Sequence, residues 1–189
     1  MKKLLLSSIF ISCWIFGLSQ NGQIENGSFE NWTNTIIFEN PDMWMTSNGS
    51  GPAFYGVSKS TDAQQGSYSC KLESEISGTD TIISYSFLGH VGQAGPDGGI
   101  PYTSTFDQIF GFYKSSMAMN DSAMVLLIRW NSGIPSYYVF LIGGTTSSWT
   151  PFSFNLPAGT QDSLFIGLAS GNPFAQQYTN TNSSVLFDN

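Results

Sequence analysis

The chain carries Asn26-Gly27-Ser28-Phe29-Glu30-Asn31-Trp32 near its start and Val185-Leu186-Phe187-Asp188-Asn189 at its end, and these two stretches determine the expected architecture. In each, a carboxylate directly follows a phenylalanine. If both form strands, the two phenylalanines point inward and Glu30 and Asp188 come together. The sequence therefore predicts two terminal strands that lie side by side. Adjacent carboxylates repel each other, so either solvent separates them or a metal ion lies between them.

Short alternating or apolar runs recur between these two stretches, and no window keeps a helical period. Gly, Pro, Asn, Ser and Asp separate the runs, as turn residues do. The expected strands are 24–32, 53–58, 67–73, 81–88, 108–114, 122–130, 136–142, 148–156 and 162–169, with a closing strand from Ser184. Segments 89–102 and 170–183 are expected to be long loops. This pattern predicts an all-β fold, a two-sheet antiparallel β-sandwich of the jelly-roll type.

The first twenty residues have the features of a secretory signal peptide. Two lysines follow Met1, an apolar run extends from Leu4 to Leu18, and small residues precede Gln20. Cleavage there leaves 21–189 as one β-sandwich domain, which is long enough to bury a core. The apolar run is short for a membrane span. We therefore expect a protein that is secreted or held at the cell surface, without membrane insertion.

The charge balance excludes some classes of partner. Cleavage leaves four basic residues against thirteen acidic ones, which moves the net charge from −7 to −9. Nucleic acids and anionic membranes need basic patches, so neither is expected as a partner. Only 10% of residues are charged whereas 15% are aromatic, which is typical of a secreted β-protein with neutral polar surfaces. Cys70 remains as a single cysteine and is expected to be buried in its strand.

Several short motifs, taken in their order along the chain, resemble a known family. They are the opening stretch, Pro41-Asp42-Met43-Trp44, Gly66-Ser67-Tyr68-Ser69-Cys70-Lys71-Leu72, Gly99-Ile100-Pro101-Tyr102, Gly111-Phe112-Tyr113-Lys114 and the closing stretch. Together they resemble the secreted jelly-roll modules of Bacteroidetes called the carbohydrate metabolism domain, and more broadly the galactose-binding-like, carbohydrate-binding jelly rolls. The resemblance covers nearly all of 21–189. It implies a Bacteroidetes source and a role in glycan handling, and the natural chain is expected to continue after Asn189 with further domains or a sorting segment.

The same resemblance implies a structural calcium ion. In related modules the ligands are the carboxylate after the opening phenylalanine, nearby backbone carbonyls and the aspartate of the closing strand. These correspond to Glu30, the backbone of 26–28 and Asp188. Asp62, the carboxylate in the loop before Gly66, is the further expected ligand. In the alternative interpretation Glu30 faces solvent and binds no metal.

Sugar binding needs flat aromatic faces with a few polar groups beside them. The candidates are Tyr102, Arg129, Trp130, Tyr137 and Tyr178. Tyr102 and Tyr178 lie in the two expected long loops. Arg129 is the one arginine of the chain and interrupts an apolar strand, so it could bond sugar hydroxyls or form a structural ion pair. The competing interpretation for each aromatic residue is a place in the core, as expected for Trp44.

Catalysis has little support in the sequence. His90 is the lone histidine, which excludes a multi-histidine metal centre, and no serine has a nucleophile signature. The first hypothesis is a secreted, non-catalytic carbohydrate-binding module with a structural calcium ion and a neutral glycan as ligand. The second is a structural or adhesive surface module that acts through protein contacts. The third, a glycan-cleaving enzyme, would require two carboxylates across a cleft.

Overall fold

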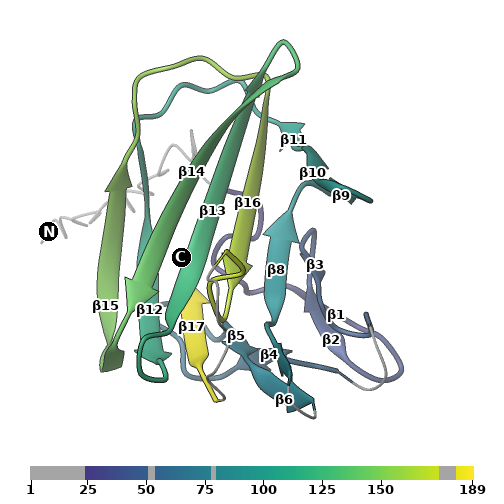
Figure 1. Cartoon of the computed structure of the whole chain (residues 1–189), viewed down its shortest axis with the longest axis vertical. Helices are drawn as coiled ribbons and strands as arrows, with labels where there is room; N and C mark the ends of the chain where they lie inside the picture. Colours follow the sequence, from purple (N-terminus) through teal and green to yellow (C-terminus); the bar gives the residue numbers. More distant parts are fainter. Residues whose placement is uncertain (1–23, 51–53, 78–79, 175–181) are drawn as a thin grey trace, which may run out of the picture.

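The computed structural model describes residues 24–50, 54–77, 80–174 and 182–189, and their regular structure is all β (Figure 1). No helix that is long and apolar enough to cross a membrane occurs among these residues. The expected signal peptide and Tyr178 lie outside them.

Two antiparallel sheets form the molecule (Figure 1). We call one the front sheet; in order across it, its strands are β14 (Ile134–Gly143), β13 (Ser122–Asn131), β16 (Ser163–Ala169), β8 (Tyr85–Leu88) and β3 (Met45–Thr46), with β11 (Ile100–Pro101) also paired to β16. The back sheet consists of β15 (Thr145–Asn155), β12 (Gln108–Ser116), β17 (Ser184–Asp188), β5 (Ser69–Glu73) and β4 (Val57–Ser60). The predicted all-β sandwich is confirmed.

Three small hairpins complete the described structure. They pair β1 (Trp32–Asn34) with β2 (Glu39–Pro41), β6 (Glu75–Ser77) with β7 (Asp80–Ile82), and β9 (His90–Gly92) with β10 (Gly95–Gly98). The last of these lies in the segment expected to be a long loop, so that prediction was wrong. Gly95 has φ +119, a conformation that glycine adopts without strain, and it begins the returning strand.

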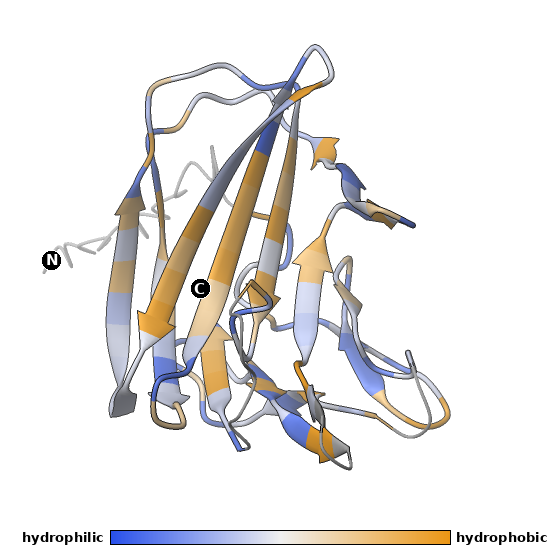
Figure 2. Cartoon of the chain, in the orientation of Figure 1, coloured by the Kyte–Doolittle hydropathy of each residue, from blue (hydrophilic) through white to orange (hydrophobic). Residues whose placement is uncertain are grey.

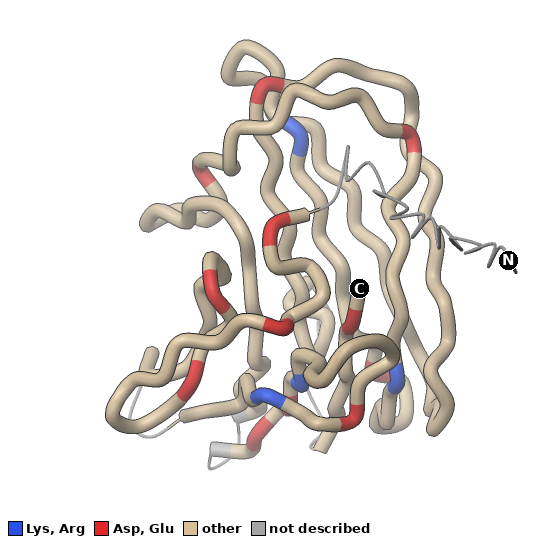
Figure 3. The backbone as a smooth tube through the Cα atoms, turned by 180° about the vertical axis from the view of Figure 1, so that it is seen from behind, with Lys and Arg blue, Asp and Glu red and all other residues tan. Residues whose placement is uncertain are grey.

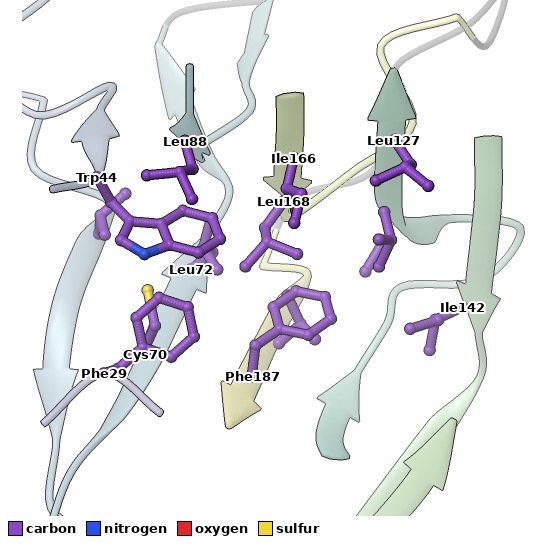
Figure 4. Close-up of a cluster of buried hydrophobic side chains, with 14 of the residues drawn as sticks. Phe29, Trp44, Cys70, Leu72, Leu88, Leu127, Ile142, Ile166, Leu168 and Phe187 are labelled. Carbon is purple, nitrogen blue, oxygen red and sulfur yellow. The ribbon is translucent and has the colours of Figure 1, made fainter. Parts of the chain in front are cut away.

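The core lies between the sheets, because alternate residues of facing strands point into the same space (Figure 4). Leu127 and Ile166 from the front sheet pack with Leu72 and Phe187 from the back sheet. Burying side chains of this size stabilises the fold by about 1.5–3 kcal/mol each. Trp44 belongs to this core, as predicted, and its ring lies 5.1 Å from that of Phe29.

Cys70 is also in the core, as its strand pattern predicted. Its thiol is fully buried, and burial raises its pKa far above the ordinary value. The thiol therefore stays protonated and packs as a small apolar group.

The opening stretch does not form the predicted terminal strand. Residues 25–28 form turns, and Asn26 and Phe29 have positive φ angles of 47° and 52°, which an extended strand cannot contain. β17 instead lies between β12 and β5. The opening and closing stretches still share the core, because Phe29 and Phe187 pack in the same cluster.

Candidate functional site

The front sheet carries a second apolar layer on the side away from the core. β13 shows why: Ala123, Val125 and Leu127 join the core, whereas the alternate residues join a separate cluster. We define the outer face of the front sheet as Met45, Tyr85, Phe87, Met124, Leu126, Ile128, Trp130, Tyr137, Val139, Leu141, Phe165, Gly167 and Ala169. Figure 2 shows that long parts of β13, β14 and β16 are hydrophobic.

Strand register arranges these side chains in rows across the sheet. One row runs Tyr137, Ile128, Phe165; the next runs Val139, Leu126, Gly167, Phe87, Met45; a third runs Leu141, Met124, Ala169, Tyr85. The middle of each row is shielded by its neighbours. The end on β14 is open in every row, with Tyr137 59% exposed, and the far ends of the second and third rows are open too, with Tyr85 40% exposed; Phe165, which ends the first row, is buried.

No charged residue occupies an outward position on the strands of the front sheet. The outside of the back sheet differs, because it holds the ion pairs Lys71–Glu73 and Lys114–Asp62. Figure 3 shows acidic residues spread over the rest of the molecule. The outer face is therefore an uncharged apolar surface on a protein of net charge −7. Its accessible side chains are Met45, Tyr85, Tyr137, Val139 and Leu141, each 40–59% exposed, and its middle is buried. Exposed apolar side chains gathered on one face mark binding sites.

Two of the predicted sugar-binding residues meet on this face. Tyr137 lies opposite Ile128, and Trp130 lies two residues further along β13, so the two aromatic side chains are diagonal neighbours. Trp130 is only 8% exposed and offers an edge rather than a full ring face. Tyr137 provides most of the accessible aromatic surface at this end.

Arg129 points to the opposite side of β13 and is 4% exposed. Its guanidinium lies 4.2 Å from the ring centre of Phe106 and 5.6 Å from that of Tyr138. Its Nη2 donates to the carbonyl of Phe106 at 2.6 Å and its Nη1 to that of Pro157 at 2.8 Å. Arg129 thus joins β13 to two connecting segments at one end of the sandwich.

Tyr102 belongs to the same end cluster. Its ring packs edge-on against Phe106 at 5.5 Å, and burial raises the pKa of its hydroxyl. The structure therefore separates the predicted sugar-binding residues into two groups. Tyr137 and Trp130 lie on the outer face, whereas Arg129 and Tyr102 lie in the end cluster.

Other outer-face residues were not among the predicted ligands, namely Tyr85, Phe87, Phe165 and Met45. Ile83, Tyr85 and Phe87 alternate along the chain, and all three lie on the outer side of the front sheet. Tyr85 stacks on Phe87 with ring centres 6.0 Å apart, and Phe87 stacks on Phe165 with ring centres 5.5 Å apart. The pattern alone does not say whether that side faces the core or the surface.

Two of the three carboxylates expected to bind calcium, Glu30 and Asp188, hold the loop of residues 64–68. Glu30 accepts hydrogen bonds from the backbone N–H of Ser67 at 2.9 Å and of Tyr68 at 3.0 Å. Asp188 accepts from Gln64 at 2.6 Å and Gln65 at 3.1 Å, both through Oδ2.

The second oxygen of Asp188, Oδ1, is buried without a hydrogen-bond partner. Burial raises the pKa of Asp188, the bonds from Gln65 and Gln64 oppose that rise, and the negative charge of Glu30 adds to it. The side chain is 3% exposed. A buried, unpartnered carboxylate oxygen beside a second carboxylate has the donor chemistry that a hard cation prefers.

Asp62 has other partners. It accepts from Nζ of Lys114 at 2.7 Å and from Nε1 of Trp149 at 3.1 Å. Among the described residues, no three His, Cys, Asp or Glu side chains gather closely enough to hold a metal ion. A cation beside Asp188 and Glu30 would therefore depend on backbone carbonyls for its remaining ligands, which calcium sites often use.

The loop held by these carboxylates depends on Gly66. Its φ is +78°, and a Cβ there would overlap Glu30 Oε1. Gly133 has nearly the same φ, +79°, with open space around it. We expect Gly133→Ala to lower the free energy of unfolding by about 1 kcal/mol, which is the cost of an alanine in the left-handed conformation. Gly66→Ala should lower it by about 3 kcal/mol, because the side chain of Glu30 must also move. Urea denaturation of both variants measures the difference, and equal losses would show that the loop tolerates the displacement of Glu30.

Comparison with models of protein families and with curated protein sequences gave no match. Among solved structures, a protein from Bacteroides thetaiotaomicron proposed to be a glycoside hydrolase matches with TM-score 0.63 and 11% identity over 85% of this chain and 68% of its own. A family 16 carbohydrate-binding module matches with TM-score 0.49 and 18% identity, and the match covers 88% of this chain and 95% of the module. The module TmCBM61, in complex with β-1,4-galactotriose, matches with TM-score 0.48 and 10% identity, and the match covers 87% of this chain and 92% of the module. At 11% identity, the match to the Bacteroides thetaiotaomicron structure shows the fold alone, an all-β jelly-roll sandwich.

Proposed function

We propose that this protein is a non-catalytic carbohydrate-binding module whose ligand lies on the outer face of the front sheet. The supporting observation is that face itself, an uncharged apolar surface with exposed tyrosine rings at opposite ends. The apolar sides of sugar rings stack on flat aromatic side chains, and the tyrosine hydroxyls can bond sugar hydroxyls. The sequence resemblance to glycan-handling jelly rolls points to the same ligand class.

The ligand is a neutral glycan longer than one sugar. A polyanion would be repelled by a protein of net charge −7, and the face offers no cation to bind it. Tyr137 and Tyr85 lie three strands apart and two rows apart. Strand spacing and rise per residue place them roughly 20 Å apart along the diagonal. A chain of several sugars could contact both rings.

Binding without cleavage fits the chemistry of this face. Glycoside hydrolysis needs two carboxyl groups on either side of the scissile bond. The outward positions of the front-sheet strands contain neither Asp nor Glu. The nearby His90–Asp97 pair on the β9–β10 hairpin supplies one carboxylate only. The signal-peptide features of residues 1–20 support export to the cell surface or medium, where polysaccharides are encountered.

A panel of soluble polysaccharides tests the proposal. The mature chain is heated with neutral, basic and acidic polysaccharides, and the unfolding midpoint Tm is followed. A ligand that binds only the folded protein raises Tm. We expect a rise with at least one neutral polysaccharide and none with acidic ones. Unchanged Tm across the whole panel would refute carbohydrate binding.

The exposed aliphatic residues favour a second candidate function. Val139, Leu141 and Met45 belong to the outer face and are about half exposed. Aliphatic side chains stack poorly on sugars but pack well against protein. A structural or adhesive module acting through protein contacts would use them. Trp44 and Trp130 are buried while Tyr137 is open, so the aromatic residues do not decide between the two.

We also propose that a calcium ion binds beside Asp188 and Glu30. It would bind the free Oδ1 of Asp188 and offset the repulsion between the two carboxylates. Its role would be structural, fixing the loop that both side chains hold.

Calcium is expected to raise Tm relative to the same protein in chelator, measured by differential scanning fluorimetry. Asp188→Asn should abolish the calcium shift while leaving the chelated protein as stable or more so, because it removes a buried charge. Glu73→Gln is the matched control: that carboxylate is exposed and paired with Lys71. Equal Tm values with calcium and with chelator would contradict the site.

A further inference from the structure

The sandwich has two sides at which its sheets end, and these sides differ in strand length and charge. On one side the edge strands are β3 and β4, which have only two and four residues, and β4 carries the Lys59–Glu39 ion pair. On the other side they are β14 and β15, which have ten and eleven residues (Figure 1). No charged residue occurs between Arg129 and Asp162, so both long edge strands are uncharged. Short strands and charges keep a sheet edge from pairing with another chain, and the β14–β15 side has neither.

The prolines distinguish the two long edges. Pro151 lies in the middle of β15, where it cannot donate a backbone hydrogen bond to a further strand. Pro135 lies near the start of β14, so residues 136–143 all keep their backbone N–H groups. Within the part of the chain that the structure describes, β14 pairs with β13 alone and no other segment bonds its backbone. The free side of β14 is therefore the edge that a further strand can extend.

The hairpin between β13 and β14 determines which backbone groups face this free side. Its two turn residues, Ser132 and Gly133, have φ angles of 53° and 79°, as in the tight two-residue turns that join antiparallel strands. In such a hairpin the pair next to the turn is hydrogen-bonded, and hydrogen-bonded and non-hydrogen-bonded pairs alternate from there. Tyr137, Val139 and Leu141 therefore direct their N–H and C=O groups away from β13.

We propose that β14 pairs antiparallel with β14 of a second copy of this chain, about a two-fold axis at Val139. Opposite residues of paired strands point to the same side of a sheet, so Val139 lies opposite itself and Tyr137 lies opposite Leu141. Each of these side chains is apolar and about half exposed in the single chain. The register overlaps nearly all of β14 and leaves Pro135 at its ends, opposite Gly143, where a missing donor costs least. The central pairs form about six backbone hydrogen bonds.

The charge distribution favours a second copy as the occupant of this edge. Two chains of net charge −7 repel each other, and they meet most readily where neither presents a charge. Aromatic rings on the inner side of the same edge are only partly buried: Phe140 stacks on Phe154 with ring centres 4.1 Å apart, and Tyr138 packs beside the core. A two-fold contact covers these rings in both copies at once, and it closes after two copies.

Pairing of this kind joins the outer faces of the two front sheets. The two Tyr137 side chains are then offset by four residues across one strand spacing, roughly 14 Å apart. They lie closer to each other than Tyr137 lies to Tyr85 within one copy. A single glycan chain could therefore contact both copies. This last consequence rests on the proposed function, whereas the dimer itself does not.

Sedimentation velocity of the mature chain without any glycan tests the pairing. We expect a monomer–dimer equilibrium within protein concentrations of about 1–100 μM. Hydrogen exchange locates the interface in the same samples. The amides of Tyr137, Val139 and Leu141 should exchange more slowly as the protein concentration rises, because the second copy bonds them.

Charge substitutions on the two-fold axis test the register. Val139→Lys and Val139→Glu each place two like charges opposite each other, so each should raise the dimer dissociation constant at least tenfold. An equimolar mixture of the two variants should dimerise again, because lysine then faces glutamate. Ser153→Lys and Ser153→Glu are the matched controls: they put the same charges at an exposed position of β15, and both should dimerise as the unsubstituted chain does.

Three results would overturn the proposal. The first is a chain that stays monomeric over the whole concentration range, which would leave the edge to a different partner. The second is a dimer that Val139→Lys leaves intact, and the third is a dimer in which the amides of Tyr137, Val139 and Leu141 exchange as in the monomer. A dimer that binds no glycan would support this pairing while contradicting the proposed function.

Discussion

Replacing Arg129 by alanine is expected to lower the free energy of unfolding by about 3 kcal/mol, measured by urea denaturation. The guanidinium donates hydrogen bonds to the carbonyls of Phe106 and Pro157 and lies close to the rings of Phe106 and Tyr138. Alanine would leave both carbonyls without their donor and would open a void at the end of the sandwich. A loss of this size is a large share of the stability of a typical domain.

Arg129→Lys tests whether the stabilisation comes from the positive charge or from the shape of the guanidinium. Arg129→Lys keeps the positive charge, but one ammonium cannot reach two carbonyls and stack as a planar group does. We expect it to recover less than half of the lost stability. A sugar-contacting arginine would behave differently, since its loss would change glycan affinity and leave unfolding nearly unchanged. That outcome would contradict the structural role assigned here to Arg129.

Tyr137→Ala is expected to weaken binding of the cognate neutral oligosaccharide at least tenfold, which corresponds to about 1.4 kcal/mol. Tyr137 supplies the most exposed aromatic ring of the outer face, so its removal deletes a stacking surface. Stability should change little, because the side chain is more than half exposed. Isothermal titration calorimetry gives the affinity and urea denaturation gives the stability of the same samples.

Phe110→Ala is the matched control for this variant. Phe110 is also an exposed aromatic residue on a strand, but it lies on the outside of the back sheet, opposite Ser153. Its removal should leave the affinity unchanged. Equal weakening by the two substitutions, or none by either, would exclude the outer face of the front sheet as the ligand site.

The central strands could be predicted from the sequence because their signals are local. β13 is a continuous apolar run and β16 begins right after a polar turn, which suffices to recognise buried strands. The strand predicted over the opening stretch does not form, and the reason is also local. Phe29 adopts a left-handed conformation that few non-glycine residues adopt, and no residue pattern announces it.

The candidate site could be predicted only in part. A strand that is apolar on both sides does not reveal which side faces the core. Trp130 and Arg129, adjacent in sequence, are therefore both candidates for sugar contact in the sequence, with a core position and a structural ion pair as the alternatives. The structure shows that they point to opposite sides of β13. The rows that connect Tyr137 to Phe165 and Met124 to Tyr85 depend on strand order, which pairs residues far apart in the chain. Periodicity within one strand contains no such information.

Backbone amide shifts, followed by NMR while the mature chain is titrated with neutral polysaccharide fragments, test the central claim most directly. Glycan binding on the outer face should give saturable changes on β13, β14, β16 and β8, largest near Tyr137 and Tyr85, with the back sheet unaffected. Changes centred on β12 and β15, or no saturable change with any neutral fragment, would contradict it.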